Sequence, residues 1–269
     1  MSDGPGPWAS GAAYDAYIGR WSRIVAADFL DWLAVPAGRR WLDVGCGTGA
    51  LTSAILGRFE PVAVVGIDPS PAFLDRARQL VVDPRASFRE GSADATGLGG
   101  GVADIAVAGL VLNFVPDIGA ALREMCRVVG PGGRVAGYVW DYGGEMQLLR
   151  RFWQAAIELD PSVTSLNQGE QFPVAAEKPF RNAFAGAGLD AVEVQPIDIT
   201  MRFNGFDDLW APFLGGTGPA PAYAGSLASP ALARLRDRFR DLCPPGPDGS
   251  IALLARTWAA RGRVPRETA

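Results

Sequence analysis

The chain has 269 residues, 48% of them hydrophobic, which suits one α/β domain with an elaboration. Its 29 acidic and 25 basic residues give a net charge of −4. A chain with this charge is not expected to bind a phosphate backbone through its overall charge, so nucleic acid is not expected as a partner. The sequence contains no histidine, which excludes histidine-based triads, histidine metal sites and a histidine general base.

The first half of the chain alternates strand patterns with helix patterns. After a Gly/Pro-rich start at 1–11, apolar residues at helical spacing predict leading helices over 12–33. Short apolar runs predict strands at 40–44, 62–68, 86–90, 103–108 and 134–140. Helices are predicted at 71–82, capped by Ser70, and at 118–129, which ends at a Gly/Pro stretch. Strands that alternate with helices specify a parallel sheet with right-handed crossovers.

The second half departs from this alternation. We expect helices at 144–159, 176–187, 206–214 and 230–242, strands at 191–203 and 250–258, and loops at 160–173 and 215–228. The fold class is therefore α/β, a doubly wound, mostly parallel sheet of seven strands in one domain over 1–269. Segments 141–175 and 206–242 are extra to it, and we expect them to be helical insertions that cover a second ligand at the carboxyl edge of the sheet.

A glycine-rich turn follows the first predicted strand, in Trp41-Leu-Asp-Val-Gly-Cys-Gly-Thr-Gly-Ala50. Glycine lets the chain turn tightly and brings backbone N–H groups close to a ligand. The next strand ends in Asp68, where a carboxylate can accept hydrogen bonds from both hydroxyls of a ribose. The pattern predicts a nucleoside-binding unit.

Two nucleoside ligands compete for this turn. Gly45, Gly47 and Ala50 satisfy the dinucleotide pattern, with an acid about 20 residues further on. Against a dinucleotide, Asp43 would repel a pyrophosphate but attract a cationic amine or sulfonium. Gly49 extends the alternate glycine spacing, and a third acid, Asp94, follows another short strand.

Five motifs in order carry a family resemblance: D-V-G-C-G-T-G, G-I-D-P-S, G-S-A-D-A, A-D-I-A-V-A-G-L-V-L-N-F-V-P-D and L-R-E-M-C-R-V-V-G-P-G-G-R-V. Over about residues 14–140 the chain resembles class I S-adenosylmethionine-dependent methyltransferases, in the small-molecule branch related to the ubiquinone and menaquinone biosynthesis enzymes. The resemblance implies S-adenosylmethionine as cofactor and S-adenosylhomocysteine as product.

The resemblance also implies roles for individual residues. Asp43 orients the methionine amino group, and Asp68 holds the ribose hydroxyls. Asp94 accepts a hydrogen bond from the adenine amino group, and Ala95 meets the adenine edge through its backbone N–H. Tyr17 and Arg20 on the leading helix are candidates for the methionine carboxylate, although a surface arginine over a packed aromatic helix explains Arg20 equally well. The remaining implied cofactor contacts are Gly45, Cys46, Gly47, Gly49, Pro69, Ser70, Ser92, Ala93, Ala108, Gly109, Leu110 and Phe114. Cys46 is interpreted as a small buried filler and not as a nucleophile, since no base is visible beside it.

The acceptor side carries fewer signals. Asn113 stands near the place where relatives often have a histidine, which removes one candidate base. Asp141 and Tyr142 follow the fifth strand and are the candidate substrate-facing catalytic groups, although Asp141-Tyr-Gly-Gly144 also reads as a simple turn. No metal site is expected.

Three functions remain open at this point. The first is methyl transfer to a small, largely apolar or aromatic metabolite at a carbon, nitrogen or oxygen atom. The second is a methyltransferase fold that binds S-adenosylmethionine but catalyses a rearrangement without methylation, or acts as a non-catalytic subunit. The third is an NAD-dependent oxidoreductase.

Compartment and partners follow from weaker signals. No apolar run reaches ~18 residues and residues 1–11 lack the features of a signal peptide, so neither a membrane span nor export is expected. Three widely spaced cysteines suit a reducing cytoplasm. We expect a cytoplasmic monomer or homodimer that acts on a small molecule.

Overall fold

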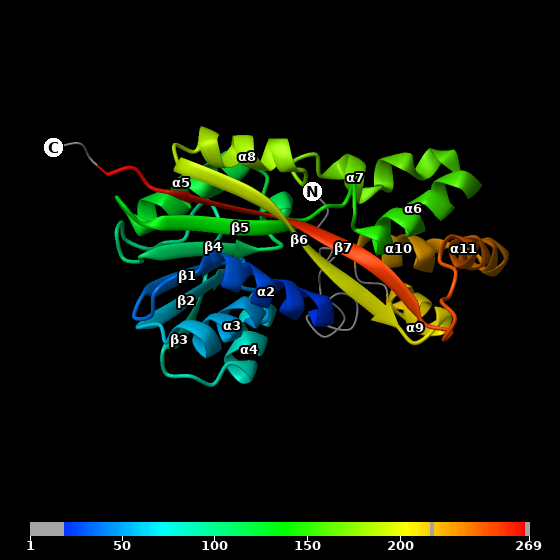
Figure 1. The fold of residues 1–269 in the computed structure, drawn as a ribbon, viewed down its shortest axis with the longest axis horizontal. Helices are drawn as coiled ribbons and strands as arrows, with labels where there is room; N and C mark the ends of the chain where they lie inside the picture. Colours follow the sequence, from blue (N-terminus) through cyan, green and yellow to red (C-terminus); the bar gives the residue numbers. More distant parts are fainter. Residues whose placement is uncertain (1–18, 216–217, 267–269) are drawn as a thin grey trace. The chain divides into compact units, whose positions relative to one another are not determined.

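A computed structural model describes residues 19–215 and 218–266, and its chain divides into two compact units (Figure 1). Among the described residues, the sheet unit comprises Ser22–Trp140, Val174–Ile197 and Thr257–Arg266. The helical unit comprises Gly19–Trp21, Asp141–Pro173 and the described part of Asp198–Arg256. The described residues of the two predicted insertions, 141–175 and 206–242, thus belong to one compact unit, except for residues 174–175.

The predicted fold class is confirmed. Seven strands form one sheet in the order β3-β2-β1-β4-β5-β7-β6. Their bounds are β1 Arg40–Val44, β2 Ala63–Asp68, β3 Ala86–Glu90, β4 Ile105–Gly109, β5 Arg134–Trp140, β6 Asp190–Phe203 and β7 Ile251–Arg263. The first five strands are parallel, whereas β7 pairs antiparallel with β5, from Arg134 opposite Arg263 to Trp140 opposite Thr257.

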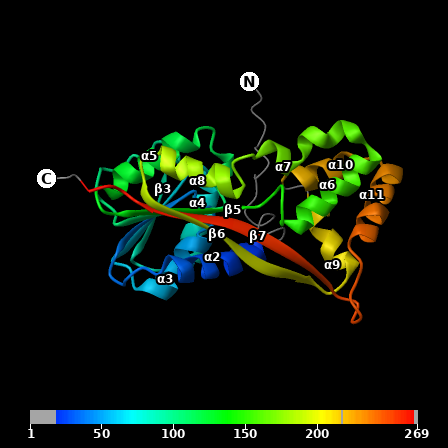
Figure 2. The ribbon, with the colours of Figure 1, turned by 45° about the horizontal axis from the view of Figure 1, so that its top comes forward.

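Helices cover both faces of this sheet. α2 (Arg20–Leu33) and α3 (Ala50–Phe59) lie on one face, and α5 (Ile118–Val129) and α8 (Glu177–Gly186) lie on the other (Figures 1 and 2). α4 (Pro71–Leu80) packs on β3 and β2. Because both faces are covered, β1 and β4 read as nearly continuous apolar runs, and their side chains are almost all buried.

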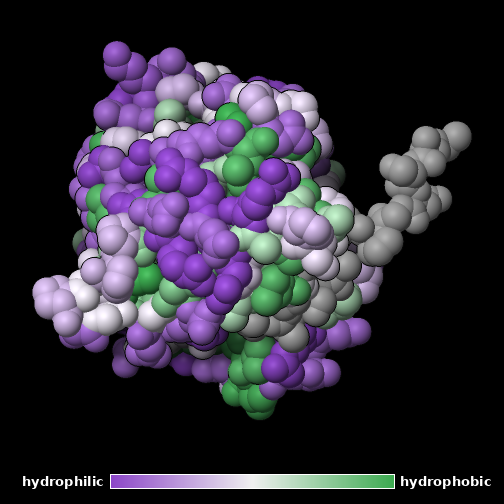
Figure 3. Space-filling model, turned by 90° about the vertical axis from the view of Figure 1, so that its right-hand side faces the viewer, coloured by the Kyte–Doolittle hydropathy of each residue, from purple (hydrophilic) through white to green (hydrophobic). Residues whose placement is uncertain are grey.

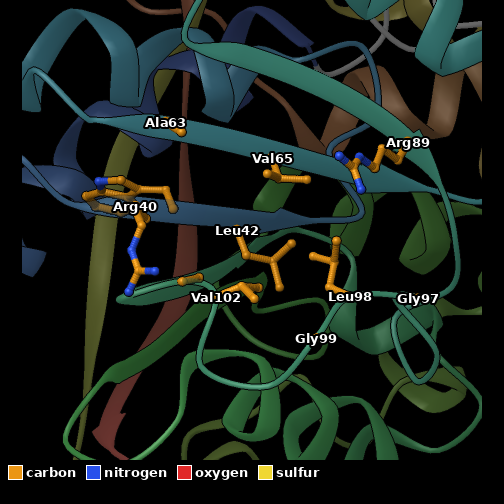
Figure 4. A pocket seen from close by; sticks show the side chains of 11 residues that line it. Arg40, Leu42, Ala63, Val65, Arg89, Gly97, Leu98, Gly99 and Val102 are labelled. Atoms are coloured by element: carbon orange, nitrogen blue, oxygen red, sulfur yellow. The ribbon is translucent and has the colours of Figure 1, made fainter.

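No helix lies between β3 and β4 in the fully described stretch 91–104. The face of β1 and β2 beside this loop carries a largely apolar pocket of about 340 Å³ (Figure 4). Its lining includes Arg40, Leu42, Val65, Arg89 and Leu98. The lining residues on β1 and β2 come from the amino-terminal halves of these central strands and not from their carboxyl ends, where parallel sheets bind ligands.

The helical unit has an aromatic core of its own. The rings of Phe152 and Phe213 stack with centroids 4.5 Å apart and planes 6° apart. Phe239 and Trp210 pack on Phe213 at 5.3 and 5.7 Å. The helices that carry these rings and their neighbours are α6 Gln147–Leu159, η3 Pro161–Leu166, α7 Gln168–Gln171, α9 Phe206–Trp210, η4 Ala211–Leu214, α10 Pro219–Ser226 and α11 Ser229–Leu242. These aromatic side chains therefore form the hydrophobic core of the helical unit.

The face of the molecule that Figure 3 shows carries more hydrophilic than hydrophobic residues. α11 buries Leu235 and Phe239 and carries four arginines from 234 to 240 in alternate positions. Among the described residues, no helix is long and apolar enough to cross a bilayer.

Several sequence predictions need correction in the second half of the chain. The predicted loop 215–228 contains α10, because prolines are well tolerated in a first helical turn. The predicted loop 160–173 contains η3 and α7, and the predicted helix 206–214 continues beyond Trp210 only as a 3-10 turn. β7 continues to Arg263, five residues beyond the predicted end, since β5 supplies a pairing partner along that length.

Candidate functional site

The strand order reverses between β1 and β4, and the site is built where these two strands end. In doubly wound sheets the crevice outside the carboxyl ends of the strands at such a reversal is the place for a ligand. The segments that meet there are the glycine loop after β1, the acid that ends β2 and the turn that follows β4.

Asp43 is the buried acid of this site, and its side chain is almost fully enclosed. Its Oδ2 accepts a hydrogen bond of 2.7 Å from Thr52 Oγ1, while its Oδ1 has no hydrogen-bond partner within the described structure. Burial raises the pKa of Asp43 to about 7, although the hydrogen bonds from Thr52 oppose this change and the charge of Asp68 adds to it. The site therefore holds an uncompensated carboxyl oxygen that suits a cationic group.

The three glycines of the loop have different surroundings although all have positive φ. A Cβ atom on Gly45 would come within 2.5 Å of the Val111 side chain, and one on Gly49 within 2.8 Å of Val81. A Cβ atom on Gly47 would meet no protein atom within 4 Å. Gly45 and Gly49 are therefore required by packing, whereas Gly47 borders open space that a ligand can approach closely.

Asp68 ties the end of β2 to the glycine loop. Its Oδ2 accepts the N–H of Gly47 at 3.0 Å, and its Oδ1 accepts the N–H of Ser70 at 2.9 Å. Burial raises the pKa of the Asp68 carboxyl, and the two backbone hydrogen bonds partly offset that effect. Each carboxylate oxygen keeps a lone pair for a further donor. Ser70 also caps α4 by accepting from Phe73 N at 3.4 Å, as predicted.

The loop after β3 closes on itself. Ser92 and Ala95 exchange two backbone hydrogen bonds of 3.3 and 3.2 Å, so the N–H of Ala95 donates to Ser92 O. Ser92 Oγ donates to Asp94 Oδ1 at 2.6 Å. Asp94 is exposed and Ala93 is half-buried. Adenine contacts by residues 92–95 stay a prediction.

The turn after β4 is strained and packed against the glycine loop. Leu110 has a φ of +59°, which is rare for a residue with a side chain, and its N–H donates to Tyr138 O at 2.8 Å. η2 (Leu112–Phe114) follows, and within the described structure neither polar atom of the buried Asn113 amide has a hydrogen-bond partner. Ala108 is buried, and Phe114 is half-buried.

Three predicted site residues, Arg20, Asp141 and Tyr142, lie in the helical unit. The Arg20 guanidinium pairs with Asp208 at 3.7 Å and lies 4.4 Å from the Trp21 ring centroid. These contacts agree with the alternative of a surface arginine over aromatic rings. Tyr17 lies outside the described residues, so the predicted carboxylate contacts stay a prediction.

Asp141 and Tyr142 form part of a turn. The Asp141 carboxylate accepts the N–H of Glu145 at 2.9 Å, and its carbonyl accepts from Gly144 and Met146. The Tyr142 ring is buried and lies 5.5 Å from the ring of Phe172. Both residues have a structural role in this turn, and a catalytic role stays a prediction.

Sequence reasoning missed two residues of the site. Thr52, in the first turn of α3, donates a hydrogen bond to Asp43, and Val111 fills the space beside Gly45. A hydroxyl nine positions after the acid is a weak signal, and nothing in the sequence indicates the contact of Val111.

Comparisons with known proteins agree with this geometry. Residues 42–137 match a family model described as a methyltransferase domain. Trans-aconitate 2-methyltransferase from Methylobacterium radiotolerans is 35% identical over 145 residues, which cover 51% of this chain and 54% of that protein. 2-Phytyl-1,4-naphtoquinone methyltransferase from Thermosynechococcus vestitus is 39% identical over 109 residues, 40% of this chain and 48% of that protein. The chain thus spans about half the length of the curated relatives that it matches.

A solved structure extends the likeness to the fold of nearly the whole chain. Phosphoethanolamine N-methyltransferase 2 from Haemonchus contortus, in complex with phosphomonomethylethanolamine and S-adenosylhomocysteine, superposes with a TM-score of 0.61 at 15% identity. The match covers 96% of this chain and 58% of that one.

Proposed function

We propose that this chain, whose residues 42–137 form a class I S-adenosylmethionine-dependent methyltransferase domain, transfers a methyl group to a small metabolite that is largely apolar or aromatic. The observation that carries the proposal is the open space at Gly47, bordered by two buried carboxyl groups, Asp43 and Asp68.

The residues present fit S-adenosylmethionine. Asp43 Oδ1, buried and without a partner in the described structure, suits the cationic methionine amine. Asp68, fixed by two backbone N–H groups, suits the ribose hydroxyls, since its oxygens keep free lone pairs. The open space at Gly47 lets backbone approach the cofactor. An NAD pyrophosphate fits less well because the buried carboxyl of Asp43 would repel it.

When bound, S-adenosylmethionine supplies a methyl group that its sulfonium has already activated. What the chain must contribute is orientation of the acceptor and exclusion of water, and positioning of this kind supplies ~7–11 kcal/mol in favourable cases. A base is needed only when the acceptor must lose a proton. With no histidine in the sequence, that base would be Asp, Glu, Tyr or water, which favours carbon or nitrogen acceptors that are already electron-rich.

The substrate class rests on charge and on the relatives. A net charge of −4 disfavours nucleic acid as a substrate. The two curated relatives above are named for an aconitate and a naphthoquinone, both small molecules. We therefore propose a small-molecule acceptor for this chain as well.

The alternative is a chain that binds S-adenosylmethionine and catalyses a rearrangement without methylation, or acts as a non-catalytic subunit. A methyltransferase fold does not by itself fix the reaction. The two functions differ in one observable, because only a methyltransferase moves labelled methyl onto a second molecule.

Two measurements test the proposal. In titration calorimetry, S-adenosylmethionine and S-adenosylhomocysteine should bind in the low micromolar range and NAD negligibly, and comparable NAD affinity would refute it. Incubation with methyl-labelled S-adenosylmethionine and a small-molecule extract should label an organic-soluble metabolite. Label that appears only on RNA or protein would refute the substrate class, and cofactor binding without any labelled product would favour the alternative.

A further inference from the structure

A largely apolar pocket lies between the sheet and the loop that joins β3 to β4, in the stretch 91–104 where the structure has no helix (Figure 4). Its volume of about 340 Å³ is that of a small-molecule site. Every residue that lines it belongs to the sheet unit. Asp43, Gly47 and Asp68 are not among its lining residues, so this pocket is distinct from the proposed cofactor site.

The loop that forms the outer wall of the pocket is held by α5 and not by the sheet. The Thr96 N–H and hydroxyl both donate to Glu124 Oε1, at 3.0 and 2.6 Å. Arg127 Nη2 donates to Leu98 O at 2.7 Å, and the Gly101 N–H donates to Arg127 O at 3.2 Å. Because these hydrogen bonds all run to one helix, they hold the loop in place without drawing it onto β1 and β2.

The side chains of the loop leave the space beneath it open. Two of the lining residues, Gly97 and Gly99, have no side chain, and a Cβ atom on Gly97 would meet no heavy atom within 4 Å. On the sheet side, Ala63 and Val65 are only half-buried, and Val102 at the end of the loop is 44% exposed. A hollow with apolar walls is the usual form of a small-molecule site.

One of the two arginines that line the pocket has no partner. Arg89 lies opposite Ile67 in the register of β3 and β2, so it shares a face of the sheet with Val65. Its guanidinium points toward Val65 and Leu98 (Figure 4), and it makes no hydrogen bond or ion pair within the described structure. At the other end of the pocket, the Arg40 guanidinium is bound to Asp104 by hydrogen bonds of 2.8 and 3.3 Å. The pocket thus combines apolar walls with one uncompensated positive charge.

We propose that this pocket is a second ligand site, which binds a small carboxylate with an apolar body, such as a medium-chain fatty acid. A guanidinium pairs with both oxygens of a carboxylate in a planar geometry, and Arg89 has these donors free. The apolar body would lie along Val65, Leu98 and Val102. The inference does not rest on the proposed function, because it concerns a different part of the sheet unit.

The size and charge of the pocket select this class of ligand. The space accommodates a short alkyl chain or an aromatic ring, but not the ~10 Å width of a helix from another protein. A phosphate dianion would find only one free guanidinium, since Arg40 is engaged by Asp104. A neutral lipid would leave Arg89 without a partner.

The first test measures the affinity of octanoate and of 1-octanol, which has a similar chain but no charge, by titration calorimetry. Wild type should bind octanoate with a Kd below about 1 mM and bind 1-octanol more weakly. Arg89→Gln should weaken octanoate binding roughly tenfold and leave 1-octanol binding unchanged. The matched control is Arg39→Gln, which removes the same charge from an exposed arginine that precedes β1 and does not line the pocket. That variant should bind octanoate as wild type does.

The second test locates the ligand. Ala63→Leu places an alkyl group in the pocket without altering Arg89, so it should abolish octanoate binding while the Tm is no lower than that of wild type. In wild type, octanoate should slow the amide exchange of residues 97–103, which form the wall of the pocket.

Several results would overturn the inference. They are a Kd of wild type for octanoate above about 1 mM, equal affinities for octanoate and 1-octanol, and a loss of octanoate binding in Arg39→Gln as large as in Arg89→Gln. Unchanged octanoate binding in a folded Ala63→Leu protein, or protection by octanoate only outside residues 97–103, would place the ligand elsewhere and would also overturn it.

Discussion

Asp43→Asn should make the free protein more stable at alkaline pH while weakening its cofactor site. The pKa of Asp43 is raised from 3.8 to about 7, mainly by burial, so the folded protein holds a proton there that the unfolded chain releases. The stability contributed by the protonated group is fully present below pH ~4 and is lost as the pH rises through 7.

The size of the change in stability follows from the shift in the pKa of Asp43. Between pH 5 and pH 8, ionisation of this one carboxyl should lower the free energy of unfolding of wild type by roughly 2–3 kcal/mol. The amide that replaces the carboxyl in Asp43→Asn cannot ionise, and its carbonyl still accepts the hydrogen bond from Thr52, so that part of the pH dependence should disappear. Thr52→Val should instead raise the pKa of Asp43 further and so enlarge the pH dependence of stability, since it removes the side-chain hydrogen bond that lowers this pKa.

Urea denaturation of both proteins at pH 5 and pH 8 measures the difference directly, because other titrating groups are common to both. Calorimetry with S-adenosylmethionine adds a functional readout: wild-type affinity should fall about tenfold from pH 8 to pH 6, since the amine needs an ionised partner. Asp43→Asn should bind more weakly and without this dependence. Parallel stability profiles for the two proteins, within ~0.5 kcal/mol, would refute the reasoning.

Four further substitutions test the site and the helical unit. Asp68→Ala should cost ~2–4 kcal/mol of cofactor affinity without unfolding the protein, because buried ribose hydroxyls lose their partner, and calorimetry beside circular dichroism measures both. Gly47→Val should abolish cofactor binding in a folded protein, whereas Gly45→Ala should lower the Tm, since its methyl group has no room; a stable Gly45→Ala would contradict the packing. In hydrogen exchange, segments 141–175 and 206–228 should open together, because the buried ring of Phe152 contacts rings of the second segment. Phe152→Ala should therefore accelerate amide exchange in both segments and leave the exchange rates of strands β1 to β4 unchanged. Uniform protection of both segments in the variant would refute this.

The sheet unit could be predicted because its signals are local. α5 is bounded by Asp117, whose side chain accepts from Ala120 N, and by Gly130 with a φ of +76°, and both residues mark helix ends in the sequence. The glycine loop and Asp68 lie where the motif placed them, since a tight turn after a buried strand permits few alternatives.

The helical unit could not be predicted to the same depth. The stretch Gly215-Gly-Thr-Gly-Pro219 indicates a turn, and the helix that begins at Pro219 is stabilised by packing that a single sequence does not reveal. Arg20 illustrates the same limit, since its partner Asp208 lies far away in the sequence. For Asn113 the residue type was visible, but its lack of a partner depends on every neighbour around it.

The contact between Gly109 and Tyr138 has a consequence for how this protein can vary. A Cβ atom on Gly109 would lie 2.7 Å from the Tyr138 hydroxyl, and the tyrosine ring is itself held at 4.6 Å from the Phe29 ring. A side chain can therefore arise at 109 only if 138 becomes smaller. Among descendants of this sequence the two positions should covary, so that glycine at 109 accompanies tyrosine at 138 and a polar side chain at 109 accompanies a small residue at 138.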